Sequence, residues 1–402
     1  MTRKEFIEQS LIMGVGMPFL STLLLQSCEE GESIFPQLQT SFSGKVIIVG
    51  AGAAGLAAGY LLKYYGVDFE ILEASPVYGG RLKKADDFAD FPIDLGAEWI
   101  HTDPKILADI INDPNARESI DILVYNPQTI QSWKNGKRKS HNYISKLYSE
   151  WKFQSTTWFG FFEQWIIPEI ADKIVLNRPV TEIDYAAEKV ILKTTENGTY
   201  EADKVLVTTS VKTLQNQQIA FRPGLPTEKT EAFHKIFMGD GIKIFVEFRE
   251  KFYPDILAFG NIFQALREAE KLVYDAAFRK ASGKHILGLF AINEKASAYT
   301  QLNSEEAIIR RFLAELDEMF DGKATANYVN HIVQNWSEEP YIQGAYSYAF
   351  EGDQNQIVAA ITEPVMDKIY FAGEALSINN QAMVHGACES AYRMVASMLK
   401  NA

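Results

Sequence analysis

Three glycines near the start of the chain have the spacing of a phosphate-binding loop. Gly50, Gly52 and Gly55 stand in the run Gly50-Ala51-Gly52-Ala53-Ala54-Gly55, between an apolar run (46–49) and a helical pattern (56–65). Gly50 permits a tight turn, Gly52 lets the backbone approach a pyrophosphate, and Gly55 allows the helix to pack on the strand. The free N–H groups at the start of that helix, from Ala53 and Ala54 onward, attract phosphate charge.

An acidic residue at the end of the next apolar run completes this pattern. Residues 68–72 have the composition of a second strand, and Glu73 follows them directly. The Glu73 carboxylate can accept hydrogen bonds from ribose hydroxyls and would repel a 2′-phosphate. Strand, helix, second strand and acid in this order predict a dinucleotide-binding βαβ unit.

The segment after Glu73 favours FAD over NAD. It ends in Gly79-Gly80-Arg81 and resembles the second fingerprint of a large FAD-binding family. The resemblance implies that Gly80 brings the backbone close to the cofactor. Arg81 can neutralise phosphate charge.

A third segment near the end of the chain resembles the closing motif of the same family. A strand pattern at 368–372 leads into Gly373 and Glu374, and the run that begins with Met383 and Val384 opens a long helix through Met398. The resemblance implies that Glu374 binds the ribityl hydroxyls and that the helix start faces the flavin, where its partial positive charge stabilises the reduced ring.

Four further stretches narrow the resemblance to the flavin amine oxidases, over most of residues 44–400. They are residues 94–101, 204–209, 241–246 and 335–346. The resemblance implies that the first passes the flavin and that the backbone of Val180 touches the adenine end. The site residues implied by these stretches are Gly96, Ala97, Glu98, His101, Lys243, Trp336 and Tyr346.

Lys243 and Tyr346 are the residues on which the predicted chemistry depends. Lys243 lies in an apolar strand, where burying an ammonium without a partner costs free energy. The simpler interpretation is a strand lysine that is exposed to water. The resemblance implies that Lys243 holds a water against the flavin, that Tyr346 walls the substrate cage, and that His101 lines the pocket. The predicted reaction turns an amine into an imine and then an aldehyde, with oxygen reduced to hydrogen peroxide.

Two departures from the family pattern concern the substrate and the cofactor linkage. Met383 stands where the family has its second cage aromatic, which makes that wall softer and leaves the substrate class open. Members that bind FAD covalently carry a cysteine before the cage tyrosine, and here that residue is Ala345. FAD is therefore predicted to bind without a covalent link.

Other functions of the same fold remain open at this stage. An FAD-dependent desaturase or dehydrogenase shares the three fingerprints but needs neither Lys243 nor Tyr346. An amino-acid oxidase or monooxygenase should use an arginine for the substrate carboxylate, for which Arg249 and Arg279 are candidates. A flavin-binding protein without turnover is the remaining alternative.

The predicted fold class is α/β, a Rossmann-like FAD-binding domain with a second, mixed-sheet substrate domain inserted discontinuously. The FAD-binding domain is predicted at 44–104, 172–237 and 344–402, and the substrate domain at 105–171 and 238–343. The net charge of −13 offers no basic surface for a nucleic acid. No metal-ligand spacing occurs, and the oligomeric state is not indicated.

The first 43 residues have the pattern of an export signal followed by a tether. Residues 1–28 combine a basic start with a short apolar run that ends in Leu25-Gln26-Ser27-Cys28, which resembles the lipobox of bacterial lipoproteins. A plain signal peptide is the alternative. Lipidation at Cys28 would make the protein an exported bacterial lipoprotein, anchored to a membrane on the periplasmic or outer face. Residues 29–43 are predicted to be a tether.

Overall fold

The computed structural model describes residues 33–195, 198–268 and 270–400, and apolar strands form the centre of its first lobe. β1 (Lys45–Val49) lies in the middle of a five-stranded sheet whose paired strands are all parallel, in the order β22-β13-β1-β2-β9. Residues 46–49 are almost fully buried, as expected for a parallel strand covered on both faces. The other strands are β2 (Asp68–Leu72), β9 (Ile174–Val175), β13 (Lys204–Val207) and β22 (Ile369–Phe371).

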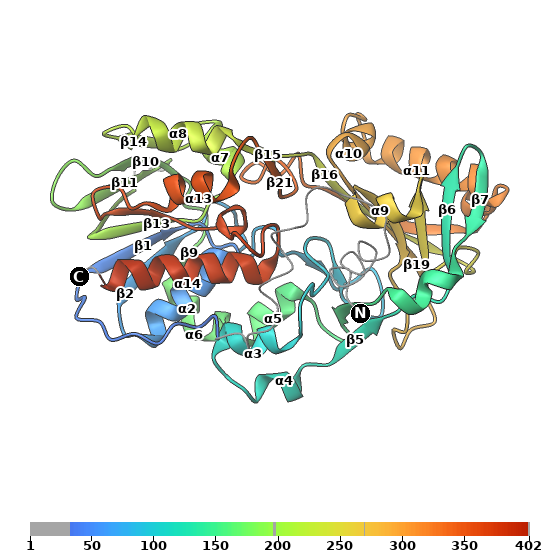
Figure 1. Ribbon diagram of the computed structural model, residues 1–402, viewed down its shortest axis with the longest axis horizontal. Coiled ribbons are helices and arrows are strands. Elements are labelled where there is room, and N and C mark those ends of the chain that lie inside the picture. Colours follow the sequence, from blue (N-terminus) through green and yellow to red (C-terminus); the bar gives the residue numbers. More distant parts are fainter. Residues whose placement is uncertain (1–32, 196–197, 269, 401–402) are drawn as a thin grey trace.

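Helices cover both faces of this sheet. α2 (Ala53–Tyr64) and α14 (Val384–Lys400) lie side by side along one face and share one core cluster with it (Figure 1). α8 (Thr227–His234) and α13 (Gln354–Thr362) belong to a second cluster on the other face. A four-stranded sheet also joins this lobe, formed by β10 (Val180–Asp184), β11 (Val190–Thr194), β12 (Thr199–Ala202) and β14 (Ala220–Arg222).

The second lobe contains a seven-stranded mixed sheet in the order β20-β16-β19-β18-β17-β6-β7. Its pairs are antiparallel except β17 with β6. The strands are β6 (Ile130–Lys134), β7 (Lys137–Ser140), β16 (Gly241–Phe248), β17 (Ile256–Phe259), β18 (Lys271–Asp275), β19 (His285–Ile292) and β20 (Tyr328–Asn335). The predicted α/β class, with a parallel Rossmann-like sheet and a separate mixed sheet, is confirmed.

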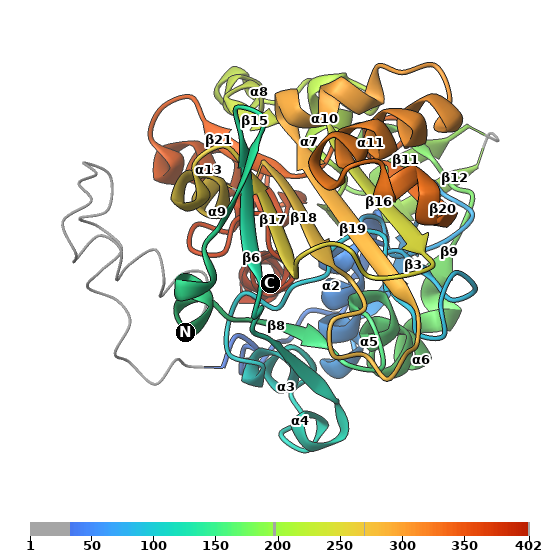
Figure 2. The same cartoon turned by 90° about the vertical axis from the view of Figure 1, so that its right-hand side faces the viewer.

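Alternation along β16 decides what each face of the mixed sheet contacts. Ile242, Ile244 and Val246 share a core cluster with α11 (Glu305–Phe320), and α10 (Asn293–Thr300) lies beside it (Figure 2). Because side chains alternate along a strand, Lys243 and Phe245 point to the opposite face. On that face Phe245 belongs to another core cluster, together with Phe88, Ile93 and Leu95.

Shorter elements complete the two lobes and the connections between them. They are β3 (Lys84–Ala85), β4 (Ile93–Asp94), α3 (Lys105–Ile111), α4 (Ala116–Ser119), β5 (Ile122–Tyr125), β8 (Glu150–Phe153), α5 (Trp158–Trp165), α6 (Ile167–Ile170), α7 (Val211–Gln215), β15 (Ile236–Met238), α9 (Ile262–Glu268), α12 (Lys323–Asn327) and β21 (Ser347–Phe350). Within the described ranges, no helix combines the length and the apolar character that crossing a membrane requires. The predicted domain boundaries stay a prediction.

The segment expected to be a tether is packed from residue 33 onward, which corrects that expectation. Phe35 is 1% exposed and contacts the rings of Tyr60, Tyr64 and Tyr392. The Thr40 hydroxyl donates to the carbonyl of Leu399 at 3.1 Å. The buried Phe35 ring therefore holds this segment against α2 and α14. The predicted signal, with Cys28, lies outside the described residues.

Candidate functional site

A cavity of about 1530 Å³ is lined by residues of both lobes. It exceeds the 300–1,000 Å³ common for small-ligand sites and so has room for a dinucleotide together with a second ligand. Among the predicted site residues, Gly55 does not line it. The predicted residues that do line it are Gly50, Gly52, Ala53, Ala54, Glu73, Gly80, Arg81, Gly96, Ala97, Glu98, His101, Val180, Lys243, Trp336, Tyr346, Gly373, Glu374, Met383 and Val384.

The glycine-rich loop forms one end of the cavity. Gly50 has φ +105°, a backbone conformation that favours glycine, and its N–H donates to the carbonyl of Leu72 at 2.8 Å. Gly52 caps α2, and a Cβ added there would approach only the Gly79 carbonyl, at 4.0 Å. A Cβ on Gly55 would lie 1.9 Å from the Gly50 carbonyl oxygen. Gly52 therefore faces open cavity, whereas Gly55 packs helix against loop.

Glu73 is held at the end of β2 by backbone donors. Its carboxylate accepts hydrogen bonds from the N–H of Ala51 at 2.6 Å and from the N–H of Ser75 at 2.8 Å. The side chain is buried, yet it lines the cavity. Each carboxylate oxygen has further lone pairs, so the group remains able to accept hydrogen bonds from a ribose.

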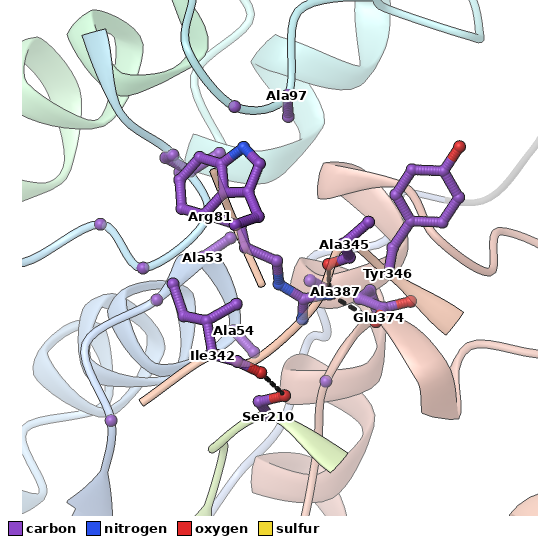
Figure 3. Close-up of a pocket in the computed structure, with 18 of the residues that line it drawn as sticks. Ala53, Ala54, Arg81, Ala97, Ser210, Ile342, Ala345, Tyr346, Glu374 and Ala387 are labelled. Atoms are coloured by element: carbon purple, nitrogen blue, oxygen red, sulfur yellow. Dashed lines mark hydrogen bonds and ion pairs between the residues drawn. The ribbon is translucent and has the colours of Figure 1, made fainter. Parts of the chain in front are cut away.

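The fingerprints at the two ends of the chain meet at Arg81. Its guanidinium donates to the Ala345 carbonyl at 2.7 Å and pairs with Glu374 at 2.9 Å, as the dashed lines in Figure 3 mark. Glu374 also accepts from the Ser347 hydroxyl at 2.6 Å and from the N–H of Ala382 at 3.1 Å. These contacts fix both side chains at the cavity wall.

The cavity's polar groups fit FAD. The start of α2 has no side-chain cap, which leaves backbone N–H groups for a pyrophosphate. Thr209 lines the same cavity, and its buried hydroxyl has no hydrogen-bond partner within the described residues. An unsatisfied buried hydroxyl in a cavity is expected where a bound group supplies the partner.

The mixed sheet forms an apolar wall at another part of the cavity. Lys243, Phe290 and Leu272 are cross-strand neighbours on β16, β19 and β18 and line the cavity together. The ring of Tyr346 stacks on that of Phe290, with centroids 6.3 Å apart and planes 9° apart. Phe290 is therefore the aromatic ring that lies parallel to Tyr346. Met383, which directly precedes α14, also lines the cavity.

Lys243 is buried, and its ammonium has three protein acceptors. Its Nζ donates to the carbonyls of Asp94 at 2.8 Å and Gly96 at 3.1 Å, and it pairs with Glu98 at 2.6 Å. An ammonium has three donors, so a water would have to replace one of these acceptors. The water-holding role of Lys243 stays a prediction.

His101, Glu150 and Trp336 also line the cavity. His101 Nδ1 lies 3.4 Å from an oxygen of Glu150, whose side chain is 1% exposed. Trp336 donates from its indole N–H to the Leu95 carbonyl at 3.1 Å, which holds it against the segment that passes the cavity.

Glu150 and Phe290, which line the cavity, and Lys152, which pairs with the lining residue Glu98, were not predicted as site residues. Glu150 and Lys152 stand two apart on β8 and so share one face, the only sequence signal available for them. Their neighbours are aromatic, and nothing local indicated that the charged face is the buried one. Phe290 has no local signal because its position depends on the register of β19 against β16.

The arginines proposed for an amino-acid substrate lie away from the cavity. Arg249 donates to the Ala326 carbonyl at an exposed position, and Arg279 stacks on Phe278. Among the described residues, the arginines that line the cavity are Arg81 and Arg178. The amino-acid oxidase alternative therefore loses both of its candidates.

Comparison with known proteins supports the resemblance to the flavin amine oxidases. The sequence profile described as "Flavin containing amine oxidoreductase" matches residues 164–399, and that of an NAD(P)-binding Rossmann-like domain matches residues 48–113. The chain is 25% identical to human lysine-specific histone demethylase 2 over 87% of its own length, and spans about half (52%) of that relative. It is 24% identical to probable polyamine oxidase 4 of Arabidopsis thaliana, over 87% of this chain and 86% of that protein.

A solved structure shares the fold. Cyclohexylamine oxidase from Brevibacterium oxydans superposes with a TM-score of 0.74 at 16% sequence identity, covering 90% of this chain and 99% of that one. At that identity the likeness establishes the architecture alone.

Proposed function

Because the chain belongs to the flavin-containing amine oxidoreductase family, we propose that it oxidises an amine with FAD and oxygen. The products are an imine, which water hydrolyses to an aldehyde and ammonia or a smaller amine, and hydrogen peroxide. The observation that carries the proposal is that the dinucleotide-binding loops and the wall of Lys243, Phe290 and Tyr346 line one cavity. A cofactor and an amine bound there would share that space.

The two ends of the chain supply the proposed cofactor contacts. The start of α2 would receive the pyrophosphate, Glu73 the ribose hydroxyls, and Glu374, fixed by Arg81, the ribityl hydroxyls. Bound FAD would supply the redox chemistry, as acceptor of a hydride from the carbon beside the amine nitrogen and donor of the electrons to oxygen. Ala345 stands before Tyr346 and offers no thiol, which supports binding without a covalent link.

The chain's own contribution to the reaction is to bind and orient the amine. The stacked rings of Phe290 and Tyr346 present apolar surface and exclude water from the amine's carbon chain. Tyr346 would orient the nitrogen lone pair. His101 and Glu150 add a polar contact for a substrate group.

A panel of amines assayed for hydrogen peroxide tests the proposal. Primary, secondary and diamine compounds are added to the FAD-loaded protein in air, with protein stripped of FAD by acid as the control. We expect peroxide with at least one amine and none from the stripped protein. A flavin-loaded protein that produces no peroxide with any of them would contradict the proposed function.

We also propose that the protein is exported and lipid-anchored. The support is the sequence pattern that ends at Cys28, in the part of the chain outside the described residues.

A further inference from the structure

A cluster of buried charged side chains lies behind the wall that carries Lys243. We call Glu98, Lys152, Lys243 and Tyr274 the Glu98 cluster. Glu98, Lys152 and Lys243 are 4–6% exposed. Burying ions costs several kcal/mol each unless they are paired and hydrogen-bonded, so each contact within the cluster carries weight.

Glu98 is the centre of this cluster. One carboxylate oxygen pairs with the Lys152 ammonium, and the other pairs with Lys243 at 2.6 Å and accepts the Tyr274 hydroxyl. Lys152 also lies over the rings of Trp99, Tyr125 and Tyr274, with its Nζ 4.7–5.5 Å from the ring centroids. Cation–π contacts of this kind stabilise an ammonium away from water. Lys152 is thus fixed independently of Lys243.

The Glu98 cluster holds more positive than negative charge. Burial acts to raise the pKa of Glu98, but Lys152 and Lys243 outweigh it and lower that pKa to about 2. Burial, with Glu98 adding to it, raises the pKa of the neighbouring Asp94 well above its ordinary value. One firmly ionised carboxylate therefore faces two ammonium groups. At the edge, burial lowers the pKa of Lys280 to about 8.

The cluster joins elements from both lobes at the cavity. Glu98 follows β4 in the segment whose Gly96 and Ala97 line the cavity, and Lys152 comes from β8. Glu98 and Lys243 themselves line it. We propose that Glu98 and Lys152 are positioning residues: the Lys152-anchored carboxylate of Glu98 fixes the Lys243 ammonium and sets the charge of the cavity wall. This rests on the proposed amine oxidation.

Four variants test the inference. Glu98→Gln removes the anion, Lys152→Met removes its anchor, and a third protein carries both changes. Lys251→Met is the matched control, because Lys251 pairs at 2.7 Å with the buried Asp255 and Asp275 of the same lobe, and none of the three lines the cavity. Anaerobic mixing with an active amine gives the rate constant of flavin reduction, and dye equilibration gives the midpoint potential of the bound flavin.

The expected results differ from those of a packing role. Glu98→Gln leaves two ammonium groups without an anion and slows flavin reduction by roughly 10²-fold, the cost of misplacing a site group by about 1 Å. The double variant relieves their repulsion and recovers part of that loss. Lys152→Met removes a positive charge from behind the wall and lowers the midpoint potential, whereas Lys251→Met leaves it unchanged.

Two results would each overturn the inference. One is a double variant with bound FAD that is as slow as Glu98→Gln or slower. The other is a Lys152→Met midpoint potential equal to that of the wild type, a measurement that needs no amine and stands even if Glu98→Gln fails to fold. If no amine reduces the wild-type flavin, the proposed function fails, while the potential still tests the positioning role.

Discussion

Glu73 is the residue that tests the dinucleotide site most sharply. Glu73→Ala removes the ribose acceptor and the carboxylate that holds the N–H groups of Ala51 and Ser75. We expect FAD binding to weaken by about 1.5–3 kcal/mol, as for hydrogen bonds to charged groups. Fluorescence titration of FAD into the apoprotein measures this. Glu70→Ala is the control, since Glu70 is partly buried, pairs with Lys45 and does not line the cavity. Equal FAD affinity in the two variants would remove Glu73 from the site.

At the scale of single residues, prediction from sequence succeeded where a motif acts through local spacing. Gly50, Gly52 and Glu73 line the cavity because strand, loop and helix lie next to one another in the chain. The partners of Glu98 were beyond reach, because Lys152 and Tyr274 come from distant strands. Lys152 lies on β8 and Tyr274 on β18, in two different sheets, so only the folded chain brings them to one carboxylate.

At the scale of elements, two glycines of one loop have different roles: Gly52 leaves space for the cofactor, and Gly55 allows the helix to pack on the loop. Gly52→Val places a branched side chain in the open space before α2, so the apoprotein should fold normally and lose FAD. Gly55→Ala places a Cβ 1.9 Å from the Gly50 carbonyl oxygen, so the apoprotein itself should be destabilised. Thermal unfolding of both apoproteins, with FAD content measured after reconstitution, checks this. Equal melting temperatures for the two variants would contradict the division of roles.

The segment from residue 33 to 43 gives a second prediction at this scale. Phe35→Ala removes a ring that is 1% exposed between α2 and α14, and we expect a loss of about 3–5 kcal/mol in the free energy of unfolding. Chemical denaturation measures it, with Val77→Ala at an exposed position as the control. A Phe35→Ala protein as stable as that control would mean that the segment does act as a loose tether. Its Ser, Pro, Gln and Thr residues concealed the one buried anchor.

At the scale of the whole molecule, the α/β class followed from the sequence because buried parallel strands have a distinctive apolar composition. The seven-stranded order did not, since it depends on pairings such as β17 with β6 that join distant parts of the chain. Periodicity identifies a strand but not its neighbours.

Membrane attachment is also a property of the whole molecule, and Cys28 tests it. In a bacterial host that processes lipoproteins, we expect the wild-type protein to enter the detergent phase of a phase-separating extraction. Cys28→Ala should enter the aqueous phase, because it lacks the residue that would carry the lipid. Wild-type protein found in the aqueous phase would show that the lipobox interpretation is wrong.

The most direct test of amine oxidation follows the flavin itself in the absence of oxygen. The FAD-loaded protein is mixed anaerobically with each amine that yields peroxide in air, and its visible absorbance is recorded before and after an oxygen pulse. We predict that the flavin absorbance bleaches with the amine and returns with oxygen, accompanied by matching amounts of aldehyde and hydrogen peroxide. A flavin that stays oxidised with every amine, although dithionite reduces it, would contradict the account.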